Sequence, residues 1–81
     1  MDIEMVRARI RTMLETGQLP CDDTERTLGG RGLGRRCSAC SEEISVDELE
    51  FKVDLVSGQT LRLHRRCHRL WLEECEPLKS A

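Results

Sequence analysis

The first sixteen residues carry apolar side chains at the spacing of one helical face. Three arginines, Arg7, Arg9 and Arg11, fall largely outside this face, so the pattern predicts an amphipathic helix over residues 2–16. Asp2 can cap its start, and Gly17 stands where a helix commonly ends. The apolar positions that form the face are Ile3, Val6, Ile10, Met13 and Leu14. We expect this segment, residues 1–16, to pack on the rest of the chain, while a dimerising or partner-binding helix is the alternative.

Residues 17–36 show neither helical nor strand periodicity and contain five of the six glycines. This composition predicts an irregular linker rich in glycine and arginine. The run from Gly29 to Gly34 superficially resembles a phosphate-binding loop. It lacks the preceding strand, the following helix and the Lys-Ser/Thr ending that such a loop needs. Contact of its arginines with nucleic-acid phosphates remains an alternative.

From Glu48 the apolar pattern changes to alternation, with Leu49, Phe51, Val53 and Leu55 on one side. This period of two predicts a strand with one buried face. Residues 56–59 supply a turn, and residues 60–63 a returning strand, so we expect a β-hairpin. A final helix is predicted near residues 65–75, with Trp71 in the core and residues 77–81 as a tail after Pro77.

Length and composition indicate that this chain needs a bound metal ion or a covalent cross-link to stabilise its fold. It has 81 residues, with one Phe, one Trp and no Tyr, and so short a chain buries little apolar surface. Five cysteines are present; their number is odd, and no secretory signal precedes them. No apolar run is long enough to span a membrane. We therefore expect a cytoplasmic, reducing environment, in which cysteines bind metal rather than form disulfides.

Two short motifs carry the candidate chemistry. Cys37 and Cys40 form a Cys-x2-Cys pair in a predicted turn, and His64 and Cys67 form a His-x2-Cys pair where the second strand gives way to the helix. Twenty-three residues separate the two pairs. Three thiolates and one imidazole suit a tetrahedral structural zinc. The spacing therefore predicts one zinc ion bound by these four residues within a module at residues 37–76.

Three further residues compete for a role at this site. His68 lies four positions after His64, the spacing seen at the end of a Cys2His2 finger, but choosing it would leave the thiolate of Cys67 unused. We therefore favour Cys67. Cys21 and Cys75 lie outside the four-residue set; we expect small buried apolar side chains there, with a redox pair or an alternate ligand as the other interpretation.

The order of a Cys-x2-Cys knuckle, a hairpin and a helix bearing His64 and Cys67 resembles the treble-clef zinc fingers. The spacing is also similar to the first finger of a LIM domain, although a second finger is missing. Residues 19–71 further resemble small, mostly uncharacterised bacterial zinc-site proteins. The resemblance implies an α+β fold: a small zinc-stabilised treble-clef-like domain preceded by an amphipathic helix.

The predicted site argues against an enzyme, because four protein ligands leave no open position on the ion. The net charge of −2 disfavours a general polyanion binder, but the charges are segregated. The first function we expect is a protein-interaction or regulatory module using the acidic strand face (Glu48, Glu50, Asp54) or the N-terminal helix. The alternative is a nucleic-acid-binding finger using Arg62, Arg65, Arg66 and Arg69, with Arg31, Arg35 and Arg36. We expect a monomer with a protein partner and with neither a membrane nor a small-molecule substrate.

Overall fold

The computed structural model describes residues 2–80, and the side chains of residues 2–78. Met1 and Ala81, which fall in the predicted terminal segments, lie outside the described residues. The chain forms one helix, then the three strands of an antiparallel sheet, then a second helix, so the predicted α+β class is confirmed. In chain order the elements are α1 (Ile3–Glu15), β1 (Thr24–Arg31), β2 (Leu49–Leu55), β3 (Thr60–His64) and α2 (Arg65–Ser80).

Helix α1 forms where its apolar stripe predicted. Asp2 caps it by accepting a hydrogen bond from the backbone N–H of Glu4 at 3.2 Å. The chain leaves the helix through Gly17, whose φ of 79° lies in the left-handed region that glycine tolerates. Val6 and Ile10 are fully buried. The helix therefore uses its apolar face for packing within this chain.

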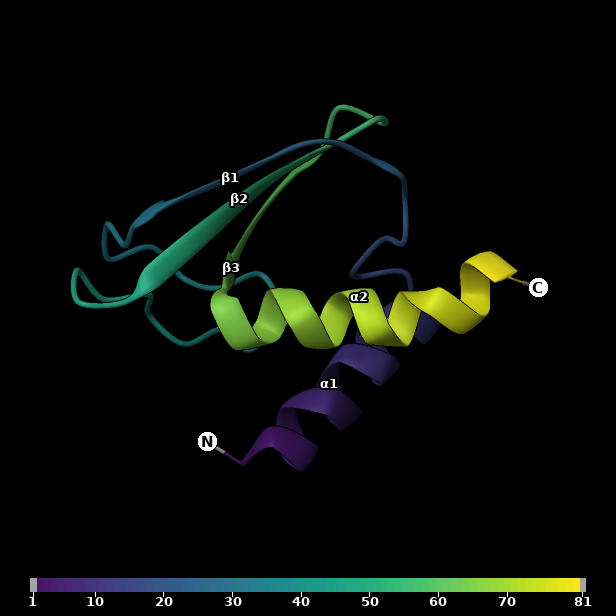
Figure 1. Cartoon of the computed structure of the whole chain (residues 1–81). Helices are drawn as coiled ribbons and strands as arrows, with labels where there is room; N and C mark the ends of the chain where they lie inside the picture. The colour runs from purple at the N-terminus through teal and green to yellow at the C-terminus, as the bar shows by residue number, and fades with distance from the viewer. Residues whose placement is uncertain (1, 81) are drawn as a thin grey trace.

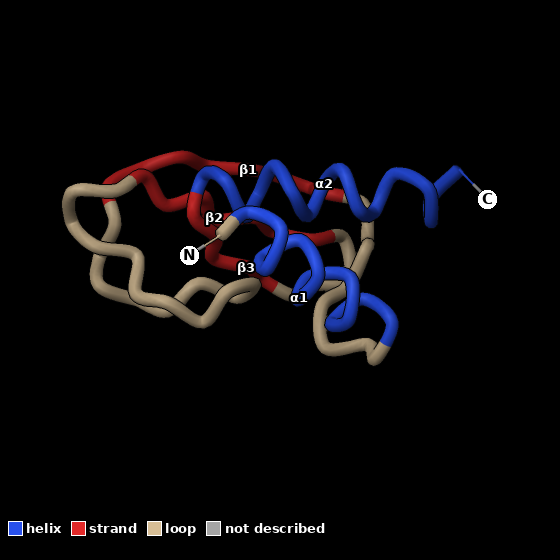
Figure 2. Tube along the Cα trace, turned by 90° about the horizontal axis from the view of Figure 1, so that it is seen from below, coloured by secondary structure: helices blue, strands red, loops and turns tan. Residues whose placement is uncertain are grey.

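Helix α2 is the middle layer of the molecule. The sheet lies on one side of it, and α1 crosses it obliquely on the other side (Figure 1). The loops between residues 32 and 48 extend beyond the end of the sheet at which β1 ends and β2 begins (Figure 2). Because β3 runs directly into α2 at this end, the loops, the sheet and the start of α2 meet there.

The predicted hairpin of β2 and β3 is confirmed, with Val53 opposite Leu61 in the register. Val53, Leu55, Leu61 and Leu63 are buried, as alternation requires. Two positions at the start of β2 depart from the prediction: Leu49 is 45% exposed, whereas Glu50 is only 8% exposed. Glu50 pairs with Gly30 on one side and with His64 on the other, inside the sheet, while Leu49 lies at the sheet's end.

The prediction of an irregular linker over residues 17–36 is wrong for its central part. Residues 24–31 form β1, which pairs with β2 as an edge strand. All eight residues are exposed, so the strand buries no face that could produce an alternating pattern. Gly29 lies opposite Phe51, and a Cβ at Gly29 would approach the Phe51 ring to 3.3 Å. The glycine permits close contact between the strands.

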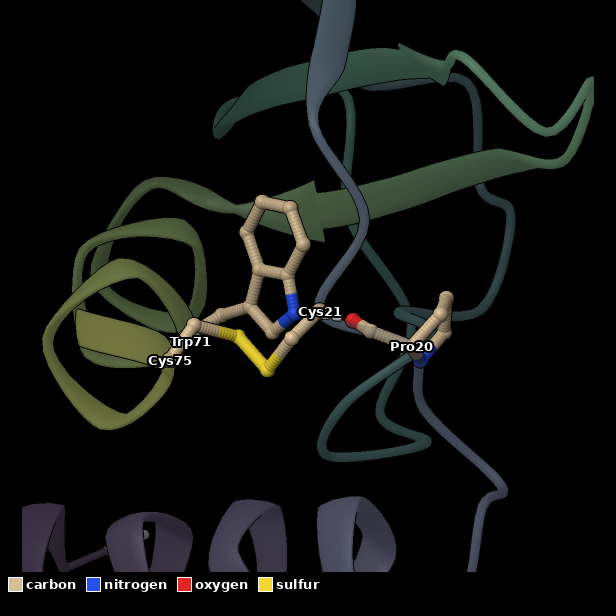
Figure 3. The surroundings of a disulfide bond; sticks show 4 residues. All are labelled: Pro20, Cys21, Trp71 and Cys75. Atoms are coloured by element: carbon tan, nitrogen blue, oxygen red, sulfur yellow. Dashed lines mark hydrogen bonds between the residues drawn. A yellow bond between two sulfur atoms is a disulfide. The ribbon is translucent and has the colours of Figure 1, made fainter. Parts of the chain in front are cut away.

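The expectation that Cys21 and Cys75 are separate, unpaired side chains is also wrong. They form a disulfide that joins the segment before β1 to the second half of α2. Beside this bond, Trp71 is fully buried and donates its indole N–H to the carbonyl oxygen of Pro20 at 2.8 Å (Figure 3). Packing of α2 against residues 19–21 brings the two cysteines to a Cα separation of 5.6 Å, which is suited to a disulfide.

Helix α2 is longer than predicted. The sequence predicted an end near residue 75 and a tail over residues 77–81, but the helix continues through Pro77 to Ser80. Proline removes the one backbone N–H that would have bonded to the carbonyl of Glu73. Since Pro77 is near the helix end, little of the helix depends on that bond.

Two features of the structure bear on the predicted cytoplasmic location. Within residues 2–80, neither helix has the length and apolar character needed to cross a lipid bilayer. The Cys21–Cys75 bond removes the premise that every cysteine in the chain is reduced. A cytoplasmic location stays a prediction.

Candidate metal centre

The four residues of the two spaced pairs come together at the junction of β3 and α2. The Sγ atoms of Cys37, Cys40 and Cys67 and a ring nitrogen of His64 all lie within 4.8 Å of one another. Each of the four residues is at most 5% exposed. His64 ends β3, and Cys67 lies in the first turn of α2. This arrangement can hold one metal ion.

The Cys37–Cys40 pair lies in a tight turn that the backbone closes. The N–H of Ser41 bonds to the carbonyl of Cys37 at 3.0 Å, and the N–H of Ala39 points to the Cys37 sulfur at 3.4 Å. Ser38 attaches the turn to the sheet: its N–H donates to the carbonyl of Arg62, and its hydroxyl accepts from the N–H of Arg62. The turn therefore occupies the free edge of β3 and faces its sulfur atoms towards His64.

The ring of His64 is oriented by its second nitrogen. Nδ1 lies 3.4 Å from the sulfur of Cys40 and 3.9 Å from that of Cys67. Nε2 lies 3.1 Å from the carbonyl oxygen of Glu43 and 3.6 Å from a carboxylate oxygen of Glu48. A carbonyl oxygen can accept a hydrogen bond but cannot donate one. In this contact Nε2 therefore carries the proton, and Nδ1 presents a lone pair to the thiols. In metal-binding histidines, the ring nitrogen that faces away from the ion usually donates its N–H to a carbonyl or carboxylate in this way.

The protonation of the three thiols fits a site built for a cation. A hydrogen bond from Cys67 lowers the pKa of Cys37 to about 4. The same bond, together with burial, raises the pKa of Cys67, and burial raises that of Cys40. Without a cation, the cluster therefore favours one thiolate and two protonated thiols. A divalent ion would offset both the desolvation and the mutual repulsion of three thiolates.

The structure separates the two competing ligands after His64. Cys67 faces the cluster, whereas His68 stacks on Phe51 with ring centroids 4.8 Å apart. Burial lowers the pKa of His68, so its imidazole is neutral at pH 7. The preference for Cys67 over His68 agrees with this placement, and His68 belongs to the packing between α2 and the sheet.

Two groups that contact the cysteine and histidine cluster were not predicted from the sequence. Arg9 of α1 donates to the carbonyl of Ala39 at 2.9 Å and to the hydroxyl of Ser41 at 2.7 Å. The first helix thus touches the cysteine turn directly. Arg9 stood on the polar side of the predicted helix, and the Glu43 acceptor is a backbone carbonyl. Neither role leaves a pattern in the sequence that could have predicted it.

The two predicted charged surfaces are smaller than the sequence suggested. Glu50 is buried, and Asp54 bonds to Arg26 and Thr60, so the acidic strand face is not a continuous free surface. On the basic side, the Nε of Arg62 is buried and Arg69 pairs with Glu73. The run from Gly29 to Gly34, whose arginine was a further candidate for phosphate contacts, lies at the end of β1 and in the loop after it.

An open groove of about 900 Å³ lies beside the centre. It lies where β2 begins, along the start of α2 and next to the start of α1. Its lining combines apolar side chains with arginines. His64 and Glu48 also line it, so the groove and the metal centre share a wall.

Comparison with other proteins identifies no family for this chain. No known protein family matches the sequence, and neither a curated protein nor a solved structure matches the chain.

Proposed function

We propose that the chain binds one structural zinc ion through Cys37, Cys40, His64 and Cys67. The observation that supports this proposal is that four buried donor atoms, three sulfurs and one imidazole nitrogen, lie within 4.8 Å of one another. Thiolates and imidazole favour zinc among common divalent ions, and three sulfurs with one nitrogen complete a tetrahedral shell. The order of cysteine turn, hairpin and helix supports a treble-clef-like arrangement.

The role of this zinc is structural and not catalytic. Four protein donors would fill all four positions of a tetrahedral zinc ion, and each donor residue is buried, which disfavours entry of a substrate or an activated water. The ion would instead join the cysteine turn, the end of β3 and the start of α2. Its binding free energy would then contribute directly to folding.

The function of the folded module is protein interaction. Several large apolar side chains are exposed, among them Ile3, Met5 and Leu49, and exposed apolar surface commonly marks a contact site. A nucleic-acid function has weaker support. Of the arginines predicted to form the basic face, Arg36 and Arg69 already bond within the described chain and the Nε of Arg62 is buried, which leaves fewer arginines for phosphate contacts.

The zinc proposal is tested by metal content and folding. Native mass spectrometry should find one zinc per chain. Chelation should strongly reduce the helical signal in far-ultraviolet circular dichroism and shift the Trp71 fluorescence. Cys67→Ser should weaken zinc binding by more than about 100-fold, since it removes a donor atom itself and not a group that orients one. His68→Ala should keep its zinc. A fold that is unchanged without metal, or equal zinc affinity in both variants, would overturn the proposal.

A further inference from the structure

We infer that the groove beside the metal centre binds a protein segment that combines acidic and apolar side chains. The inference deepens the proposed interaction function and rests on it. The groove has an apolar floor and a basic rim, and each part can be traced to named residues. The floor and rim residues considered below are Ile3, Leu49, Phe51, Leu70, Arg65 and Arg66.

The floor contains apolar surface that the fold leaves uncovered. Ile3 at the start of α1 is 50% exposed, and Leu49 at the start of β2 is 45% exposed. Leu70 and the half-buried Phe51 continue the surface inwards. These side chains come from three elements that converge at one end of the molecule. Burying an apolar side chain among them would remove this surface from water.

The charges along the groove do not balance internally. Glu73 is engaged by Arg7 at 2.9 Å and by Arg69 at 3.3 Å. Glu48 accepts a hydrogen bond from the backbone N–H of Ser45 and lies 3.6 Å from Nε2 of His64. Within the described residues, the guanidinium groups of Arg65 and Arg66 form neither a hydrogen bond nor a salt bridge; the charge of Arg66 attracts Glu48 across the groove. Both arginines are exposed on the rim.

An acidic and apolar segment complements both features. Its carboxylates would pair with Arg65 and Arg66, because guanidinium groups bind carboxylates in a bidentate geometry. Its apolar side chains would cover Ile3 and Leu49. A single-stranded nucleic acid would meet the same two arginines. Two rings of the groove lining, Phe51 and His68, already stack on each other, which leaves less ring surface for base stacking.

The two rim arginines lie between metal ligands. Arg65 and Arg66 occupy the two positions that separate His64 from Cys67, and Glu48 on the opposite wall approaches the His64 ring. The centre therefore fixes the backbone that carries the rim. Removal of the metal should abolish binding of the segment together with the fold of this end.

The test is a titration of the zinc-loaded full chain, isotope-labelled for amide NMR. The probe is a pool of short synthetic peptides in which Asp or Glu alternates with Leu, Ile or Phe. We expect a Kd of about 0.1 mM or tighter at low salt, with the largest shifts at Ile3, Leu49 and residues 65–70. The reversal Arg65→Glu with Arg66→Glu should weaken binding by about tenfold or more. Arg35→Glu, an exposed charge outside the groove, should leave it unchanged.

A second pair of variants tests the floor without altering the segment between the ligands. Leu49→Ser should weaken binding by about fivefold, whereas Val56→Ser, at an exposed position in the hairpin turn, should not. A Kd weaker than about 1 mM, or shifts that map elsewhere, would overturn the inference. Equal binding of a pool with serine at the apolar positions, or of a single-stranded oligonucleotide, would overturn it in favour of a polyanion site.

Zinc content and circular dichroism, measured on the same samples, separate the two proposals. One zinc and an intact fold without peptide binding would refute only the groove. An intact fold in a sample that lacks zinc would refute the structural role of the metal, whether or not the peptides bind.

Discussion

The indole N–H of Trp71 and the carbonyl oxygen of Pro20 are joined by a 2.8 Å hydrogen bond across 51 positions of sequence. Trp71→Phe would remove the donor, leave the carbonyl unpaired and open a space in the core. We expect a loss of about 2–4 kcal/mol in the free energy of unfolding, measured by urea denaturation. Leu72→Ala, at an exposed neighbour, should change it by less than about 0.5 kcal/mol. Equal effects would show that the bond is unimportant.

The disulfide between Cys21 and Cys75 should stabilise the fold by restricting the unfolded chain. The bond closes a loop of 54 positions, for which the chain-entropy argument gives about 4 kcal/mol. A reducing agent should therefore lower the midpoint of denaturation. The double variant Cys21→Ser with Cys75→Ala should start at the lower midpoint and not respond to the reducing agent. A response in this variant would place the sensitivity at the metal centre.

Gly32 is required by a backbone contact. A Cβ at this position would clash with the backbone carbonyl oxygen of Ser45, in the loop that leads to β2. Gly32→Ala should therefore destabilise the protein by about 1–3 kcal/mol and disturb the loop next to the centre. Gly30→Ala is the matched control, since no atom lies within 4 Å of the added carbon. Thermal denaturation followed by circular dichroism compares them, and equal midpoints would contradict the prediction.

Glu74 of α2 binds two arginines of α1, Arg7 at 2.9 Å and Arg11 at 2.8 Å. Hydrogen bonds from Arg11 and Arg7 hold the pKa of Glu74 below its ordinary value of 4.5. The stabilisation is thus present at neutral pH and lost as the pH falls through this lowered pKa. Glu74→Gln should lower the melting temperature at pH 7 by a few degrees.

The control for Glu74 is Glu76→Gln, at an exposed position of the same helix. Its melting temperature should stay near that of the unmodified protein. High salt should reduce the effect of Glu74→Gln, because ions screen the pair with Arg11, whose side chain is exposed. An effect of equal size in concentrated salt would assign the loss to packing.

The sequence predicted those parts of the fold that bury a periodic face. Val6 and Ile10 indicated α1, and Val53 and Leu61 indicated the hairpin. Strand β1 gave no such pattern because all its residues are exposed. Pairing of Cys21 with Cys75 depends on how the second half of α2 packs, which neither local spacing nor composition contains.

The clustering of Cys37, Cys40, His64 and Cys67 was predictable because these residues come in two local pairs. The two-residue gaps of Cys37 with Cys40 and of His64 with Cys67 report the geometry of a turn and of a helix start. The groups that orient them were not predictable in the same way. Glu43 acts through a backbone carbonyl, an atom that every residue type possesses.

The disulfide encloses the metal centre along the chain: all four donors lie between positions 21 and 75. The two closures are therefore nested, and α1 lies outside both. A protease that cuts once between residues 22 and 74 would leave two fragments joined through sulfur until a reductant separates them. A cut within residues 17–20 would instead leave α1 without a covalent link to the rest of the chain, held by non-covalent contacts such as Arg7 with Glu74 and Arg9 with the carbonyl of Ala39.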